Sequence, residues 1–527
     1  MKNHDAGAAY AENVLYQCRG NVSWLSPSAV AAILPGMRES ALAPRRHRTS
    51  RRGGPLSDTR YISTRGEAPE LGFEDVVLAG LARDGGLYVP SVWPHFERDE
   101  IAGFAGRPFH EIAAAVIAPF ASGTFTREEL TGLARDAYSG FGHTAVTPIA
   151  QLTPHRFVLE LFHGPTLAFK DVAMQFLSRL MDRILAARSA RATIVCATSG
   201  DTGGAAVEAF RGAHDVDIVV LFPEGRVSDV QRRMMTTPDE DNVHALSIRG
   251  TFDDCQALVK AMFNDLAFRD RVALSGVNSI NWARVVPQVS YYFAAAVALG
   301  APHRPVSFTV PTGNFGDIFA GYVARRMGLP IENLTIASNE NDILPRTLET
   351  GSYEKHAVVA TTSPSMDIQV SSNFERVLFE ATGRDAALIR SWMASLAQSG
   401  RFELGETANY MRQEFSAAAA SEPEVADAIV RTRAETGYVL EPHTACGVIA
   451  SEKTGAARSV DLPDIVLATA HPAKFPEAMR QITGAAVPLP PRLAHLMEVP
   501  ERMTSLENDL AAVQQYILKH TRSVNGS

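Results

Sequence analysis

The sequence predicts an α/β protein in which parallel β-sheets are covered by helices on both faces. Beyond Ala145, short apolar runs alternate repeatedly with segments whose apolar residues recur at helical spacing. Alternation at these lengths is typical of βαβ units, whose strands run parallel. Three loops rich in glycine and polar residues each follow a strand-like run and precede a helix-like one. Because such loops emerge at the carboxyl ends of parallel strands, we expect them to line one crevice.

The composition excludes several classes of protein. The chain has 527 residues, 46% of them hydrophobic and 20% charged, which is ordinary for a globular protein and excludes a fibrous or wholly disordered one. With 50 Lys and Arg against 58 Asp and Glu, the net charge of −8 argues against nucleic acid as a main partner. The longest mostly apolar run, residues 291–299, is too short to cross a membrane. Four scattered cysteines without a C-x-x-C pair favour a reducing, cytoplasmic location.

Residues 1–57 differ from the rest of the chain. They hold eight basic and three acidic residues, a net charge of +5, so that the total of −8 leaves −13 for residues 58–527. Five of the arginines fall within residues 44–52, where there is almost nothing to bury. A poorly ordered leader, a basic binding arm and an organelle transit peptide are the alternatives. We expect the first, a basic extension without a catalytic role.

A small N-terminal domain is expected over residues 58–145. Residues 59–63 resemble a short strand, residues 73–81 a helix with one apolar face, and residues 84–90 a turn that leads into an extended segment. Apolar residues spaced three and four apart then continue to Gly142, which indicates further helices.

Alternating strands and helices are expected in a core over residues 146–480, and a helical segment packed on that core over residues 481–527. The expected strands cover residues 156–161, 193–197, 217–222, 243–248, 306–310 and 334–337. The expected helices cover residues 173–185, 203–210, 282–299 and 318–326.

The first of the three loops, residues 162–171, places Lys170 at the start of a helix. The partial positive charge of the helix N-terminus and partial burial both disfavour the ammonium form, as in lysines used for Schiff-base chemistry. An isolated lysine that begins a helix is more often a surface residue. The apolar residues 167–169 and the Gly-Pro turn before them favour the reactive lysine here.

The second and third loops indicate anion binding. In residues 197–204, small hydroxyl residues and glycines leave backbone N–H groups free for a carboxylate or phosphate, although a simple tight turn would look the same. In residues 311–317, Gly313 and Gly316 let the backbone wrap a phosphate at a helix N-terminus. Neither a Walker A loop nor a G-x-G-x-x-G fingerprint occurs in these loops. A reactive lysine with two anion cradles points to pyridoxal 5'-phosphate as cofactor.

With these motifs the sequence resembles the threonine synthase family, in its longer fungal and bacterial branch. The resemblance spans about residues 60–480 and rests on the segments 60–66, 162–171, 199–203, 313–317 and 468–475. It implies the pyridoxal-phosphate fold-type II, similar to the tryptophan synthase β chain, with two α/β lobes and a small N-terminal domain. The implied reaction turns O-phospho-L-homoserine and water into L-threonine and phosphate by γ-elimination and β-addition. A phospho-lyase that releases a 2-oxo acid, and a catalytically silent binding module, remain alternatives.

The resemblance also implies roles for single residues. Lys170 would carry the cofactor and then move protons at the substrate α and β carbons. Asp201 would lie near the cofactor O3′, and Thr469 would hydrogen-bond the pyridine nitrogen. The cofactor phosphate would be bound at Gly313, Asn314, Phe315, Gly316 and Asp317. The substrate carboxylate would be bound at Thr198, Ser199 and Thr202.

A γ-elimination of phosphate needs a second anion site, for which two clusters compete. One cluster consists of Ser279, Asn281 and Arg284, and the other of Ser371, Ser372, Asn373 and Arg376. The arginines supply charge-assisted donors. His443 and Cys446 lack further ligands at metal spacing, so that no metal is expected. The expected partner is the small-molecule substrate alone, and the chain is expected to be a monomer or a small homo-oligomer.

Overall fold

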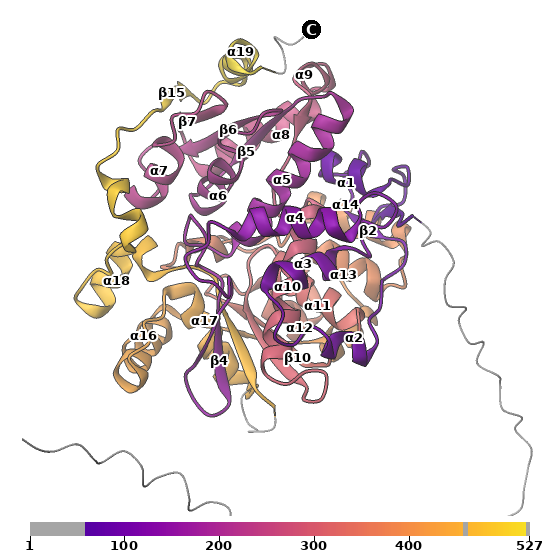
Figure 1. Ribbon diagram of the computed structural model, residues 1–527, viewed down its shortest axis with the longest axis vertical. Helices are drawn as coiled ribbons and strands as arrows, with labels where there is room; N and C mark the ends of the chain where they lie inside the picture. Colours follow the sequence, from indigo (N-terminus) through magenta and orange to yellow (C-terminus); the bar gives the residue numbers. More distant parts are fainter. Residues whose placement is uncertain (1–57, 457–461, 523–527) are drawn as a thin grey trace, which may run out of the picture. The chain divides into compact units, whose positions relative to one another are not determined.

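The computed structural model describes residues 58–456 and 462–522, all of which belong to one compact unit (Figure 1). The basic extension over residues 1–57, with Cys18, lies outside the described residues. Within the described ranges, no helix has both the length and the hydropathy that a membrane span requires.

The larger of two main sheets has six strands in the order β13-β10-β9-β14-β4-β3. Neighbouring strands run parallel except β3, which forms an antiparallel hairpin with β4. Both β9 and β14 are buried along their whole length, as expected for a parallel sheet covered on two faces. The strands are β3 (Ile149–Gln151), β4 (Arg156–Glu160), β9 (Val306–Pro311), β10 (Ile331–Ser338), β13 (Phe415–Ala419) and β14 (Asp464–Ala468).

Helices from distant parts of the chain cover the larger sheet. Helix α17 packs on four of the six strands, β9, β10, β13 and β14. Helix α11 packs on β9 and β10 and against α10. The helices of this lobe are α10 (Trp282–Ala298), α11 (Gly316–Arg326), α12 (Ile343–Thr350), α13 (Phe374–Ala381), α14 (Ala386–Ser399), α15 (Thr407–Glu414), α16 (Glu422–Thr436), α17 (Pro442–Thr454) and α18 (Pro476–Thr483). A small antiparallel pair joins β11 (Ser352–Glu354) to β12 (Arg401–Glu403).

The smaller sheet has five parallel strands in the order β15-β7-β6-β5-β8. Its strands are β5 (Ala192–Ala197), β6 (Val216–Pro223), β7 (Val243–Arg249), β8 (Leu274–Ser275) and β15 (Thr504–Glu507). The helices of this lobe are α5 (Lys170–Arg188), α6 (Asp201–Phe210), α7 (Asp229–Thr236), α8 (Phe252–Asn264) and α9 (Leu266–Arg271). The parallel sheets covered by helices that the alternation predicts are therefore confirmed, as are the two lobes that the resemblance implies.

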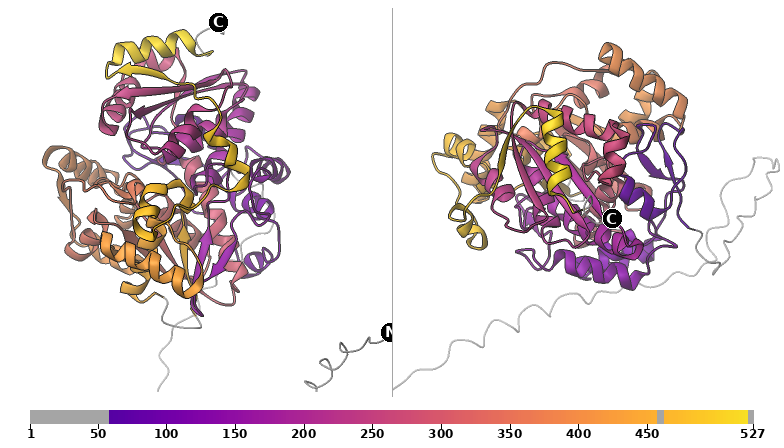
Figure 2. Two further views of the ribbon diagram at one scale, coloured as in Figure 1. Left: turned by 90° about the vertical axis from the view of Figure 1, so that its left-hand side faces the viewer. Right: turned by 90° about the horizontal axis from the view of Figure 1, so that it is seen from above.

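The C-terminal segment completes the smaller sheet. We expected residues 481–527 to be helical, and this is wrong for β15, which pairs in parallel with β7. The described remainder contains a 3-10 helix over Pro491–Met497 and helix α19 (Leu510–His520), which packs on α8. Figure 2 shows this yellow segment along one side of the smaller sheet.

The N-terminal residues share their core with the larger lobe. Strands β1 (Tyr61–Ser63) and β2 (Tyr88–Pro90) pair antiparallel, helix α3 packs against α10, and helix α4 packs against α5. The buried Trp282 of α10 contacts the rings of Tyr61, Trp93 and Phe120, with centroids 5.6–6.1 Å apart. Because the described residues form one compact unit, the division into domains at residues 145 and 480 stays a prediction. The helices of this part are α1 (Phe73–Ala79), α2 (Arg98–Ala102), α3 (Phe109–Ile117) and α4 (Arg127–Tyr138).

Candidate active site

A cavity of about 1160 Å³ lies where the loops of both sheets meet. It is bordered by the loop after β4, by α6 after β5, by the loop after β9 and by the loop after β14. The three loops expected to share one crevice therefore do so. The predicted site residues on its wall are Lys170, Asp201, Thr202, Ser279, Arg284, Gly313, Asn314, Phe315, Gly316, Asp317, Ser372 and Thr469.

Lys170 is the first residue of α5, and the turn before it is fixed from both sides. The carboxylate of the buried Asp171 accepts hydrogen bonds from the backbone N–H (2.8 Å) and the hydroxyl (2.6 Å) of Thr166. The N–H of Phe169 donates to the carbonyl of Thr469 at 2.8 Å. These bonds hold the lysine and the loop after β14 together on one wall of the cavity.

The amine of Lys170 lies in a nearly closed environment. Its side chain is 12% exposed, and its Nζ is 3.3 Å from Oδ2 of Asp201. Burial lowers the pKa of Lys170; the carboxylate of Asp201 opposes this shift, while the cations of Lys474 and Arg284 add to it. A lysine of lowered pKa releases its proton more readily and is better able to act as a nucleophile or base.

Asp201, the first residue of α6, is surrounded by donors. Its Oδ1 lies 2.6 Å from Nζ of Lys474 and accepts a hydrogen bond from Gln231 at 2.9 Å, and its Oδ2 accepts one from the hydroxyl of Ser365 at 3.1 Å. Burial alone would raise the pKa of Asp201, but Lys474 and Lys170 hold it well below its usual range. The sequence alone assigns no role to Lys474, Gln231 or Ser365, and of the three only Lys474 lies in one of the motifs, that of residues 468–475.

The loop between β9 and α11 has the geometry of an anion cradle. A Cβ on Gly313 would lie 2.7 Å from the carbonyl oxygen of Ser365, so that only glycine fits there. Phe315 takes a left-handed conformation (φ 61°), and its ring is buried against Phe374 and Phe415. The ring anchors the loop, so that residues 313–316 line the cavity at the N-terminus of α11, where an anion is favoured.

Asp317, in the first turn of α11, is a buried carboxyl group on the cavity wall. Its Oδ1 accepts hydrogen bonds from the hydroxyls of Tyr291 (2.5 Å) and Tyr292 (3.0 Å), while its Oδ2 has no partner among the described residues. Burial raises the pKa of Asp317 to about 7. The group can therefore be protonated beside the cradle near neutral pH, which limits its repulsion of a bound anion.

Replacing Asp317 with asparagine should make the cofactor-free protein less sensitive to pH. Because the folded pKa is raised, the proton on Asp317 stabilises the fold at low pH, and this stabilisation is lost as the pH rises from about 4 through about 7. Between pH 5 and 8 we expect the unfolding free energy of D317N to fall by about 2–3 kcal/mol less than that of the wild type. Urea unfolding at the two pH values measures this difference, and equal pH dependence would contradict it.

The predicted carboxylate ligands separate into two groups. Thr202 lines the cavity, whereas Thr198 and Ser199 do not. The hydroxyl oxygen of the buried Thr198 accepts hydrogen bonds from the N–H groups of Gly200 (2.9 Å) and Gly203 (2.8 Å). Thr198 thus shapes the loop between β5 and α6, and the structure gives it no access to a substrate.

Of the first candidate cluster for the substrate phosphate, Arg284 and Ser279 reach the cavity and Asn281 does not. The guanidinium of Arg284 donates to the carbonyl of Val277 at 2.7 Å, its buried Nε has no partner among the described residues, and burial lowers its pKa to about 10. Asn281 instead caps α10, since its Oδ1 accepts from the N–H of Ala283 at 2.9 Å.

The second cluster is largely structural, which corrects the prediction for Arg376 and Asn373. Both side chains are fully buried and line neither large cavity. Arg376 donates to the carbonyls of Tyr88 (3.1 Å) and Ile280 (2.6 Å) and to Oδ1 of Asn373. The guanidinium therefore has its partners within the protein, and it joins strand β2 to the segments beside the cradle.

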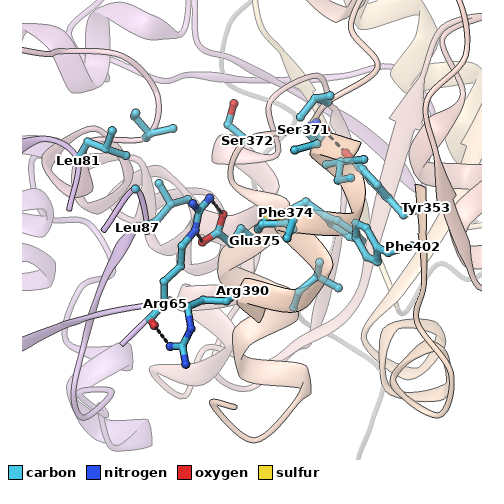
Figure 3. A pocket seen from close by; sticks show the side chains of 18 of the residues that line it. Arg65, Leu81, Leu87, Tyr353, Ser371, Ser372, Phe374, Glu375, Arg390 and Phe402 are labelled. Carbon is cyan, nitrogen blue, oxygen red and sulfur yellow. Dashed lines mark hydrogen bonds and ion pairs between the residues drawn. The ribbon is translucent and has the colours of Figure 1, made fainter. Parts of the chain in front are cut away.

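A second cavity of about 830 Å³ adjoins the first (Figure 3). The two share five wall residues, which are Leu81, Lys260, Ile280, Val370 and Ser372. The predicted Ser371 lines only the second cavity, where its N–H donates to the hydroxyl of Tyr353 at 2.9 Å. The ion pair between Arg65 and Glu375 forms one side of this cavity, with two hydrogen bonds of 3.1 and 2.9 Å.

His443 lies on the wall of the first cavity as a positioning group. Its Nδ1 is 2.7 Å from Oε2 of Glu441, and its Nε2 accepts a hydrogen bond from the N–H of Ser365 at 3.2 Å, so that the ring proton belongs on Nδ1. The carboxylate of Glu441 thus orients the imidazole, and the imidazole orients the segment that donates to Asp201. In the described part of the chain, no three His, Cys, Asp or Glu side chains come together to hold a metal ion.

Three family models match successive parts of the chain. The model "Threonine synthase N terminus" matches residues 60–138, "Pyridoxal-phosphate dependent enzyme" matches residues 140–410, and "Threonine synthase, C-terminal" matches residues 444–517. Together they cover the lysine loop and the phosphate cradle as well as most of the C-terminal segment.

Known proteins are similar to this chain over most of its length. A threonine synthase from Pseudomonas aeruginosa is 50% identical over 463 residues, which are 88% of this chain and 98% of that protein. The crystal structure of PLP-bound threonine synthase from Brucella melitensis matches with a TM-score of 0.86 and 58% identity, over 88% of this chain and 100% of that one. The threonine synthase structure from yeast matches with a TM-score of 0.83 and 37% identity, over 88% and 99%.

Proposed function

This chain belongs to the threonine synthase family of pyridoxal-phosphate enzymes, and we propose that it converts O-phospho-L-homoserine and water into L-threonine and phosphate. The observation that carries this proposal is Lys170, a lysine of lowered pKa on the wall of a cavity that also holds an anion cradle. We also propose a cytoplasmic location, in keeping with three free, buried cysteines among the described residues, and a monomer or small homo-oligomer.

The residues of the cavity fit pyridoxal phosphate. The backbone around Gly313 and Gly316, at the N-terminus of α11, suits its phosphate group, and Lys170 suits its aldehyde. Thr469, which the backbone bond to Phe169 holds beside Lys170, suits the ring nitrogen. When bound, the cofactor supplies an electron sink for the carbanion formed at the substrate α carbon.

Lys170 and its neighbours then carry the proton transfers. Its amine removes the proton at the α carbon and moves protons at the β carbon. The lowered pKa of Lys170 suits this role, because the amine releases each proton more readily. Asp201 keeps a fixed negative charge 3.3 Å from that amine. This charge stabilises the ammonium form that arises when the amine takes up a proton. The small exposed fraction of Lys170 limits exchange of this proton with bulk water.

Arg284 and Ser279 are the candidates that we favour for the substrate phosphate. Among the predicted phosphate ligands, Arg284 combines a guanidinium on the cavity wall with a buried Nε that lacks a partner in the described residues. A buried donor without a hydrogen-bond partner costs free energy. An anion bound beside Arg284 would accept that hydrogen bond and remove the cost. Thr202, which is also on the wall, would then bind the carboxylate.

The products of the purified holoenzyme test this function. With O-phospho-L-homoserine as substrate, we expect threonine and inorganic phosphate in equal amounts. Phosphate with 2-oxobutyrate and ammonia, and no threonine, would establish the phospho-lyase instead. Binding of the substrate without release of phosphate would identify a binding module.

A further inference from the structure

Two lysines share one buried carboxylate in this site. Asp201 is 5% exposed and lies between Nζ of Lys474 at 2.6 Å and Nζ of Lys170 at 3.3 Å. Lys474 is fully buried and does not line the cavity, so that it is out of reach of a ligand there. Among the described residues, the partner of its ammonium group is Asp201. The closer of the two cations is therefore the one without access to substrate.

The position of Lys474 is fixed by the loop that carries it. It ends the 3-10 helix over Pro472–Lys474, and its N–H donates to the carbonyl of His471 at 3.1 Å. The N–H of His471 in turn donates to the carbonyl of Leu167 in the lysine loop at 3.0 Å. Lys474 and Lys170 thus approach Asp201 from two loops that are bonded to each other.

A single carboxylate beside Lys170 would hinder its work as a base. An ion pair favours the charged ammonium form, and a buried carboxylate becomes costly whenever its only cation loses its charge. Lys170 loses its charge each time it gives up its proton. Lys474, at the shorter distance, leaves Asp201 paired during that time.

We propose that Lys474 is a positioning residue, a permanent counterion that keeps Asp201 ionised and paired when Lys170 is uncharged, and thereby makes Lys170 available as a base. This inference rests on the proposed use of Lys170 by the enzyme. It assigns to the lysine of the 468–475 motif a role that acts through Asp201 and not by contact with the substrate.

Gln231 provides a matched comparison, because it donates to the same Oδ1 of Asp201 at 2.9 Å without a charge. If Lys474 acted only by filling space and forming a hydrogen bond, loss of either side chain would have similar effects. If its charge matters, K474Q should shift the pH dependence of Lys170 more than Q231L does. K474R, which keeps the charge, should stay close to the wild type in that pH dependence.

The test measures how fast the cofactor-free protein takes up pyridoxal phosphate as a function of pH, followed by absorbance. This rate depends on the uncharged fraction of Lys170 and needs no turnover. In K474Q the loss of a nearby positive charge should move the midpoint upward by about one to two pH units. In Q231L and K474R the midpoint should stay within about half a unit of the wild type. The acid limb of kcat, which reports on the enzyme–substrate complex in which Lys170 acts as the base, should move in parallel.

Two results would overturn the proposal: an unchanged midpoint in folded K474Q, or an equal shift in Q231L. Should K474Q fail to fold, the double variant D201N/K474Q, which removes both charges, should recover folding, and its failure to do so would also contradict the counterion role. Wild-type protein that takes up no cofactor at any pH would instead contradict the proposed function. Uptake without threonine formation would leave the role of Lys474 measurable and refute only the reaction.

Discussion

Replacement of Lys170 with alanine should lower the rate of threonine formation by at least about 10³-fold and abolish the borohydride-sensitive absorption of the bound cofactor. The amine is the base that the proton transfers require, and neither Lys474 nor Arg284 can substitute, since both are held by other partners. Steady-state kinetics and a visible spectrum of the reconstituted variant measure the two effects.

Lys453→Ala is the matched control for this experiment. The Lys453 side chain is 41% exposed at the end of α17, where its Nζ lies 2.8 Å from a carboxylate oxygen of Glu424. Exposed ion pairs contribute little, so that activity and spectrum should stay as in the wild type. A K170A variant that keeps more than about a tenth of the activity would show that another group performs the proton transfers.

The features predictable from sequence are those that a short segment encodes by itself. Lys170, Gly313 and Thr469 lie in loops that directly follow buried strands, and parallel topology brings such loops to one crevice. The apolar run 218–222 in β6 is typical of a strand in a parallel sheet that is covered on both faces. Pattern and topology together therefore predict the architecture and the place of the lysine.

The contacts around Asp201 could not be predicted in this way. Gln231, Ser365 and Lys474 reach it from α7, from the segment before α13 and from the loop after β14. Each is an ordinary polar residue in its own segment, and only tertiary packing brings them together. Strand β15 was missed for a related reason: it is a short edge strand of mixed polarity, in which Leu506 packs on the core beside polar neighbours.

Arg376 shows why residue type alone misleads. A motif of Ser, Ser, Asn and Arg suits phosphate binding, and the sequence cannot reveal that the arginine is enclosed. In the structure its guanidinium lies 5.6 Å from the ring centroid of Trp282 and donates to acceptors from three segments. Burial lowers the pKa of Arg376 to about 9, which reflects the desolvation that these bonds must offset.

Replacing Arg376 with leucine should therefore reduce the unfolding free energy by about 3–5 kcal/mol. The substitution leaves the carbonyls of Tyr88 and Ile280 and the Oδ1 of Asn373 without their donor, and of these residues Tyr88 and Asn373 are buried. R376K keeps a charge but cannot reach three acceptors with one ammonium group, so that an intermediate loss is expected. Urea unfolding of the holoenzyme measures both.

The control is Arg183→Leu, because Arg183 is 53% exposed and forms a 3.5 Å ion pair with Glu129. Loss of this side chain should lower the unfolding free energy by less than about 1 kcal/mol.

The same variants distinguish the two roles considered for Arg376. A structural arginine predicts lower stability with a nearly unchanged KM for O-phospho-L-homoserine in the fraction that remains folded. A phosphate ligand predicts the reverse, wild-type stability with a KM raised by about tenfold or more, since charge-assisted hydrogen bonds to a phosphate contribute about 1.5–3 kcal/mol each. That second outcome would restore Arg376 as a candidate ligand of the substrate phosphate and refute the structural role that its burial supports.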